Sequence, residues 1–342
     1  MKTLGKILTM TLTLLLALNC FAAGKNTVKK PVKKGSSDVE IFTERNNRSE
    51  LLKGILPENV KTIACIAAGS YPGSAGYKKG IELLRQAGYK VKVMPNARLY
   101  EAPSKIKKVP KDKRFSDFKQ AWFDPEVDLI WAIRGGNHAQ ELVNMLDYEA
   151  MRKKQVKFVG FSNITVLHQA LQKNNVAKLY NGPSATSMLR LDQASRDWFK
   201  NCLAGAELPP VQLTALRPAP VPCSGKATGG HITMLYWAVR DNYHMPTKDK
   251  IVFLESNNRS LKVNTEILDK LVKERYFDKC KAVVFGEFNN MSKADQLKMF
   301  KEFTVKVSCP VYYNYPYGHG KRSFLIDLDR IKTIDEKAVL TQ

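Results

Sequence analysis

The sequence of 342 residues is poor in the patterns that mark metal and nucleotide sites. It has six cysteines, none of them in a C-x-x-C pair, so the usual spacing of zinc ligands is absent. The glycines at 69, 73 and 76 do not match the G-x-G-x-x-G spacing of a dinucleotide site. The sequence therefore indicates neither a metal site nor a dinucleotide cofactor.

Acidic residues are scarce relative to basic ones. The 32 Asp and Glu residues stand against 55 Lys and Arg, giving a formal net charge of +23. Such a surface suits nucleic acid, an anionic cell-wall polymer or a membrane surface. No basic run is interleaved with aromatics, so a nucleic-acid groove is not indicated. The alternative is an enzyme with scattered lysines, and 44% hydrophobic with 25% charged residues is ordinary for a globular protein.

The apolar run near the N-terminus is too short for a comfortable membrane span. It covers 7–18, follows two lysines and precedes small residues at Ala22 and Ala23, which is typical of an export signal. We favour cleavage near Ala22 over lipidation at Cys20, because Asn19 is bulky where a lipoprotein signal usually has a small residue. A retained anchor is the remaining alternative. We therefore expect an exported protein, periplasmic or secreted.

Changes in composition divide the chain into five parts. These are a signal peptide (1–22), a basic linker and lead-in (23–55), an N-terminal domain with the nucleophile (56–200), a proline-rich connection (201–224) and a C-terminal domain (225–342). The basic linker is expected either to hold the protein near an anionic surface or to be a solvated tether without a role. Export would permit disulfides, and Cys202 with Cys223 is one possible pair.

Strands and helices alternate along the first half of the chain. The predicted strands are 62–68, 90–94, 128–133 and 156–159, and the predicted helices are 77–87, 115–121, 140–146 and 164–173. The second half has predicted strands at 251–255, 282–285 and 311–313 and a helix at 265–275. Strands separated by helices imply an α/β fold with a parallel sheet and helices on both faces. We expect two domains with a cleft between them.

Ser162 is the candidate nucleophile. It follows the apolar run 156–159 and directly precedes the helix predicted at 164–173. Many hydrolases present a nucleophilic serine at such a tight strand-to-helix turn. The helix N-terminus behind it favours developing negative charge. A serine hydroxyl also needs a general base and a group that orients this base.

The base and its partner have several candidates. The histidines are His138, His168, His231, His244 and His319. His168 lies on an apolar helical stripe and is expected in the core. His319 is favoured as the base, because its two flanking glycines let the backbone bring the imidazole close to another element. Glu255 ends an apolar strand, where catalytic groups often lie, although a carboxylate there could simply face solvent.

The strand predicted at 128–133 runs into the turn Gly135-Gly136. Exposed backbone N–H groups there could bind an oxyanion, together with the N–H group of Asn163, which follows the candidate serine. The alternative is a tight turn that merely needs small residues. Sequence alone leaves both possibilities open.

Several segments resemble the LD-carboxypeptidases, a family that includes muramoyltetrapeptide carboxypeptidases and microcin-immunity serine peptidases. They occur in family-like order and spacing between about residues 61 and 331: 124–136, 159–165, Gly182-Pro183, Gly225 with Gly229-Gly230, 253–255 and 316–320. The resemblance implies a triad in which Ser162 is the nucleophile, His319 the general base and acid, and Glu255 the group that orients the histidine. It also implies an oxyanion hole formed by the Gly135-Gly136 turn and the Asn163 amide.

The resemblance further implies an N-terminal α/β domain with a parallel sheet and a smaller C-terminal domain of mixed strands, commonly in a dimer. The family reaction hydrolyses the bond before a terminal D-alanine in peptidoglycan tetrapeptides, without a metal or another cofactor. The expected partners are thus wall-derived peptides, a second copy of the chain and, through the basic linker, a wall or membrane surface. We expect no nucleic-acid partner.

The neighbours of the implied triad depart from the family pattern at Asn163, Ser256, Asn181, His231 and Asn137-His138. A retained triad with altered neighbours indicates divergent specificity. We therefore expect an exported serine carboxypeptidase acting on peptidoglycan-derived peptides. The alternatives are a hydrolase of another peptide or peptidyl conjugate, as in the microcin-immunity branch, and a catalytically silent protein that binds wall peptides.

Overall fold

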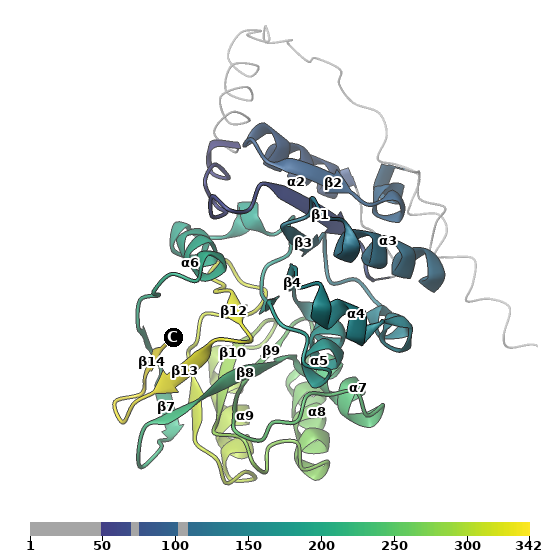
Figure 1. Cartoon of the computed structure of the whole chain (residues 1–342). Helices are drawn as coiled ribbons and strands as arrows, with labels where there is room; N and C mark the ends of the chain where they lie inside the picture. Colours follow the sequence, from purple (N-terminus) through teal and green to yellow (C-terminus); the bar gives the residue numbers. More distant parts are fainter. Residues whose placement is uncertain (1–48, 70–74, 102–108) are drawn as a thin grey trace, which may run out of the picture. The chain divides into compact units, whose positions relative to one another are not determined.

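Two β-sheets form the framework of the described residues (Figure 1). The computed structural model describes residues 49–69, 75–101 and 109–342, all of which belong to one compact unit, 45–342. The predicted signal peptide and most of the basic linker lie outside the described residues. Within the described ranges, no helix combines the length and apolarity needed to cross a bilayer.

The first sheet has the strand order β12-β5-β4-β3-β1-β2. Its strands are β1 (Thr62–Ile66), β2 (Lys90–Val93), β3 (Leu129–Ala132), β4 (Lys157–Gly160), β5 (Leu179–Asn181) and β12 (Ile326–Asp327). All pair in parallel except β12, which joins β5 antiparallel. β1 and β3 are buried along their whole length and apolar except at Thr62, as expected for parallel strands covered on both faces.

Helices surround this sheet. They are α2 (Ala75–Gln86), α3 (Lys111–Phe123), α4 (Tyr148–Lys153), α5 (Thr165–Lys173) and α6 (Gln193–Ala204), with 3₁₀ turns η1 (Pro95–Glu101), η2 (Ala139–Met145), η3 (Ser162–Ile164) and η4 (Met188–Arg190). α2 packs against β2, α3 against β1 and α5 against β5. Local signals set the ends of α6: Asp192 caps its first turn, and Gly205 ends it in the left-handed region.

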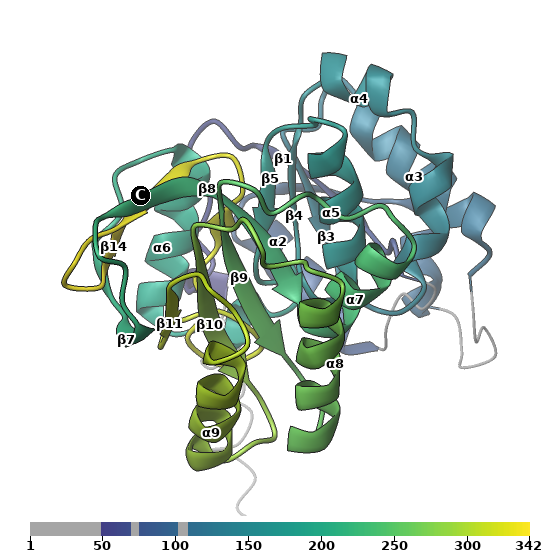
Figure 2. The same cartoon turned by 90° about the horizontal axis from the view of Figure 1, so that it is seen from below.

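The second sheet is mixed, with the order β6-β14-β13-β8-β9-β10-β11-β7. Its strands are β6 (Val211–Gln212), β7 (Thr214–Arg217), β8 (Cys223–His231), β9 (Lys250–Ser256), β10 (Ala282–Phe288), β11 (Val311–Tyr313), β13 (Ile331–Ile334) and β14 (Val339–Thr341). Only the run from β8 to β11 is parallel. Helices α7 (Ile232–Arg240), α8 (Leu261–Lys273) and α9 (Lys293–Thr304) accompany it (Figure 2).

Helix α5 joins the two sheets, because it packs against α7 and β8 as well as against β5. Gln172 donates to the carbonyl of Ala227 at 2.9 Å, and Gln169 donates to the hydroxyl of Thr228 at 3.1 Å. These buried amides fix the helix that follows Ser162 against the second sheet. The two sheets therefore hold a defined position relative to each other within this unit.

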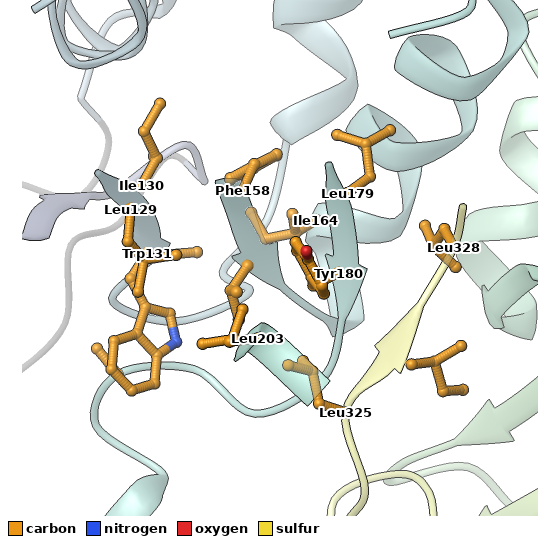
Figure 3. Close-up of a cluster of buried hydrophobic side chains, with 14 of the residues drawn as sticks. Leu129, Ile130, Trp131, Phe158, Ile164, Leu179, Tyr180, Leu203, Leu325 and Leu328 are labelled. Carbon is orange, nitrogen blue, oxygen red and sulfur yellow. The ribbon is translucent and has the colours of Figure 1, made fainter. Parts of the chain in front are cut away.

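The chain returns to the first sheet near its C-terminus. Leu325 and Leu328, which flank β12, point into the apolar cluster formed by β3, β4, β5 and α6 (Figure 3). The indole of Trp198 donates to the carbonyl of Leu325 at 2.9 Å. This return anchors the segment that carries His319, which lies just before β12.

The predicted α/β fold class is confirmed, and so are the predicted strands, with ends shifted by at most three residues. The helix predicted at 140–146 is wrong, because η2 is a 3₁₀ helix of seven residues that begins after His138 in the left-handed region. The segment predicted as a connection, 201–224, supplies β6 and β7. Cys202 and Cys223 are both free thiols.

Candidate active site

Ser162 lies at a strained turn between β4 and α5. Its φ of 60° places it in the left-handed region, which a residue other than glycine rarely adopts. Gly160 makes the turn possible, because a Cβ there would lie 2.7 Å from Ile164 Cγ2. Ser162 stays partly exposed whereas Phe161 and Asn163 are buried. This is the geometry in which hydrolases present a nucleophilic serine.

The Gly135-Gly136 turn lies against Ser162. A Cβ at Gly135 would be 2.7 Å from Ser162 Cβ and 3.0 Å from the amide nitrogen of Asn163. Gly136 has a φ of 72°, which favours glycine. The backbone of this turn and the Asn163 amide therefore border the same small space beside the serine.

Two buried polar side chains hold this turn in place. Asn163 accepts a hydrogen bond from the amide of Ala139 at 2.8 Å, so its side chain supports the chain that follows the glycines. Arg114 donates to the carbonyls of Ala68 at 2.7 Å and His138 at 3.1 Å and pairs with Glu141. The sequence does not predict this role of Arg114, because nothing in its local pattern separates it from a surface arginine of α3.

Glu255 and His319 meet directly. The distance between Glu255 Oε2 and His319 Nδ1 is 2.8 Å, although the two residues are 64 positions apart. Glu255 has no exposed area, so the alternative of a carboxylate facing solvent is wrong. Burial alone would raise the pKa of Glu255, but the charges of His319 and His231 and the hydrogen bond to His319 lower it below its ordinary value. Glu255 is therefore an ionised partner for the imidazole.

The loop that carries His319 is tied to both sheets. Glu287 of β10 donates its amide hydrogen to the carbonyl of Tyr317 at 2.7 Å, and the Tyr317 hydroxyl donates to Asn181 of β5 at 3.0 Å. Gly318 has a φ of 133° and Ser323 Oγ donates to its carbonyl at 2.8 Å. These contacts leave the His319 ring little freedom.

The structure thus forms two groups: Ser162 with Gly135 and Asn163, and Glu255 with His319. Phe161 lies beside both groups. It directly precedes Ser162 in the chain, and the centroid of its ring lies 4.4 Å from that of the His319 ring. Among the described residues, no hydrogen bond links the Ser162 hydroxyl to His319. Such bonds are often long in an enzyme without substrate and shorten when substrate binds.

The other histidines lie in different surroundings. His168 is fully buried against Phe158, as predicted for a core residue, and burial lowers its pKa to about 3. His231 caps α7, and its buried ring lies 6.2 Å from that of His319. Burial lowers the pKa of His231. The sequence places His231 directly after Gly229-Gly230, but it does not predict that His231 lies close to His319.

No group of three or more His, Cys, Asp or Glu side chains in the described ranges is arranged to hold a metal ion.

The chain matches two family models. Residues 62–182 match the LD-carboxypeptidase N-terminal domain, and residues 224–331 match the LD-carboxypeptidase C-terminal domain. Among curated relatives, the murein tetrapeptide carboxypeptidase of Pseudomonas aeruginosa is 25% identical over 231 residues, which is 62% of this chain and 74% of that protein. A relative from Rickettsia conorii is 27% identical over 216 residues, covering 61% of this chain and 68% of that protein.

Solved structures share the fold. The muramoyltetrapeptide carboxypeptidase from Oxalobacter formigenes matches with a TM-score of 0.71 at 24% identity, covering 82% of this chain and 98% of its own. An MccF-like protein from Bacillus anthracis matches with a TM-score of 0.72 at 21% identity, covering 83% and 97%. These structures show the fold, and the two family models, which together cover most of the chain, show that the chain belongs to the LD-carboxypeptidase family and is a serine-type carboxypeptidase.

Proposed function

We propose that this protein is an exported carboxypeptidase that removes the terminal D-amino acid from peptidoglycan-derived peptides, using Ser162, His319 and Glu255 as its triad. The observation that carries the proposal is the 2.8 Å pair between the buried Glu255 carboxylate and the imidazole of His319, next to the strained Ser162 turn. The murein and muramoyl tetrapeptide carboxypeptidases among its relatives support the substrate class.

The proposed reaction begins with the Ser162 hydroxyl. His319 accepts its proton at Nε2 while Oγ attacks the carbonyl before the terminal residue. Backbone N–H groups of the Gly135-Gly136 turn and Asn163 hold the resulting oxyanion. His319 then gives the proton to the leaving amine, and an acyl group remains on Ser162. Water, deprotonated by the same imidazole, releases the shortened peptide.

Glu255 sets the tautomer of His319 in this scheme. Because its pKa is lowered, the carboxylate is charged at neutral pH and accepts the Nδ1–H hydrogen. The Nε2 lone pair is then free to take the proton of the serine. The buried negative charge also stabilises the imidazolium that forms during attack.

Export, the tether and the dimer belong to the same proposal. The apolar segment 7–18 would direct the chain out of the cytoplasm, and the basic linker would keep it near an anionic wall or membrane surface. An exported enzyme would act on the wall itself or on released fragments. A second copy of the chain is the proposed assembly partner.

The test is hydrolysis of a disaccharide tetrapeptide by the protein without residues 1–22, followed by mass spectrometry. We expect the tripeptide product and its loss in Ser162→Ala. Ser308→Ala is the matched control, because this exposed serine lies three residues before β11, away from the Ser162 turn. Absence of tripeptide with the folded wild type would overturn the proposed substrate, and tight binding without turnover would favour a silent binding protein.

A second candidate is hydrolysis of a peptidyl conjugate, as in the microcin-immunity branch. It is favoured by the fold shared with MccF solved in complex with glutamyl sulfamoyl guanosine, which matches with a TM-score of 0.70 at 16% identity over 83% of this chain and 96% of that one. The altered neighbours His231 and Asn181 are compatible with either substrate. Measuring kcat/KM for an aminoacyl sulfamoyl nucleoside and for the tetrapeptide under the same conditions separates the two candidates. The substrate with the higher kcat/KM identifies the favoured function.

A further inference from the structure

Three cysteines gather at one edge of the second sheet. Cys223 begins β8, Cys280 lies two residues before β10, and Cys309 lies two residues before β11. Because β8 to β11 run parallel, these positions share the amino-terminal edge of the sheet. Glu255 lies at the carboxyl end of β9, so this edge is remote from the candidate active site.

Cys280 and Cys309 belong to the same buried cluster, and each thiol shifts the pKa of the other. The thiol of Cys280 donates to the carbonyl of Phe277 at 3.3 Å. The two cysteines precede neighbouring strands, and the amide of Val283 donates to the carbonyl of Pro310 at 2.9 Å beside them. Adjacent strands lie about 4.8 Å apart. Continued from the pair Val283 and Val311, the register places Cys309 opposite Lys281, one residue from Cys280. A diagonal pair at this strand spacing falls within the Cα separation of about 4.4–6.8 Å that a disulfide spans.

We propose that Cys280 and Cys309 form a disulfide when the protein meets a small disulfide oxidant such as glutathione disulfide. Cys309 attacks as the thiolate, forms a mixed disulfide and releases one glutathione thiolate. The Cys280 sulfur, having lost its proton to solvent, then attacks Cys309 and releases the second glutathione. Two protein thiols are oxidised and one glutathione disulfide is reduced to two thiols, so electrons and sulfur balance.

The surroundings of the pair determine which sulfur reacts first. The interaction with Cys280 lowers the pKa of Cys309 although Cys309 is buried, and Arg217 acts in the same direction. The pKa of Cys280 is raised by the same interaction and by burial. Thiolate is the reactive form, so Cys309 is the better initial nucleophile.

The remaining described cysteines provide controls. Cys65 is fully buried in β1, and burial raises its pKa to about 12. Cys202 is buried and donates to the carbonyl of Leu325 at 3.6 Å. Neither contacts another thiol in the described part of the chain. Cys223 is partly exposed and lies near the pair, so it is the competing partner that the test must distinguish.

The disulfide would close the loop from 280 to 309, which contains β10 and α9. A cross-link of this length restricts the unfolded chain and so favours the folded one. It leaves the opposite edge of the sheet unchanged. We therefore expect higher thermal stability with unchanged hydrolysis, and this inference goes beyond the proposed function.

The experiment treats the folded protein with glutathione disulfide, counts free thiols and maps cross-linked peptides without reduction. We expect the count to fall by two, a peptide pair joining Cys280 to Cys309, and a Tm several degrees higher that dithiothreitol reverses. Cys223→Ala should keep the cross-link, as should Cys65→Ala. Cys280→Ala should lose it and instead carry glutathione on Cys309.

An unchanged thiol count, or a cross-link from Cys223 to either partner in the wild type, would overturn the inference. No substrate is needed for these measurements. A negative result in these measurements would therefore overturn the disulfide alone and would not bear on whether the protein hydrolyses the tetrapeptide.

Discussion

The serine side and the acid–base side of the site are built in different ways. The serine side comes from the short turns after β3 and β4, whose shape depends on Gly135 and Gly160. The acid–base side joins Glu255 and His319 over 64 positions and depends on contacts from two sheets. A local motif can therefore specify the Ser162 turn, whereas the orientation of His319 against Glu255 is a property of the whole fold.

The largest expected effect comes from removing either the hydroxyl of Ser162 or the imidazole of His319, between which the proton is proposed to move. Ser162→Ala and His319→Ala should each lower kcat by roughly 10⁴- to 10⁶-fold, and the double variant should be no worse than the poorer single one, because the two groups act as a unit. Steady-state kinetics on the tetrapeptide measures this. Strict additivity in the double variant would mean that the two sides work independently.

Glu255→Gln tests the acid–base side alone. The amide keeps the size of the carboxylate but cannot accept the Nδ1–H hydrogen with a full charge, so the wrong tautomer of His319 is favoured. We expect kcat to fall by roughly 10³- to 10⁴-fold with little change in KM. Glu287→Gln is the control, because this carboxylate lies beside Gly320 rather than on the imidazole. Equal losses in both variants would contradict the assigned role of Glu255.

Gly135→Ala tests the serine side alone. The new Cβ would lie 2.7 Å from Ser162 Cβ, so the turn or the serine must shift and the oxyanion donors move with it. We expect kcat to fall by roughly 10²- to 10³-fold while the protein stays folded. Gly80→Ala is the matched control, because its Cβ would first meet another side chain at 3.4 Å. Near-normal turnover in Gly135→Ala would separate this turn from catalysis.

The last prediction concerns stability in acid rather than turnover. His168 stays neutral when folded down to a pKa of about 3, whereas the unfolded chain takes up a proton near pH 6.5. Above pH 6.5 both states are neutral and the group has no effect. Between pH 6.5 and 3 it lowers the free energy of unfolding by about 1.4 kcal/mol per pH unit.

Denaturant unfolding at several pH values measures that slope. His168→Leu should flatten the fall in unfolding free energy below pH 6.5, whatever its stability at neutral pH. An equal slope in His168→Leu and the wild type would show that other groups control acid unfolding.

Sequence predicted the serine side better than the rest of the molecule. The apolar run before Gly160 and the helix after Ser162 are neighbours in sequence, so periodicity and turn chemistry were enough to place them. Glu255 was found by its position at a strand end and His319 by its flanking glycines. Their pairing followed only from the family resemblance.

Other features depend on contacts that local patterns do not encode. β12 has two residues and exists because the chain returns to pair with β5. Arg114 holds the carbonyls of Ala68 and His138, which are distant in sequence. The 3₁₀ helix η2 follows a turn that this arginine and Asn163 fix, so its sequence alone resembled an ordinary helix.

The most direct test of the central claim is labelling with a fluorophosphonate, followed by peptide mapping. If Glu255 and His319 activate Ser162, the wild type should carry one adduct, on Ser162, and His319→Ala should lose it. An adduct on another residue, or equal labelling of Ser162 in His319→Ala, would contradict the proposed triad.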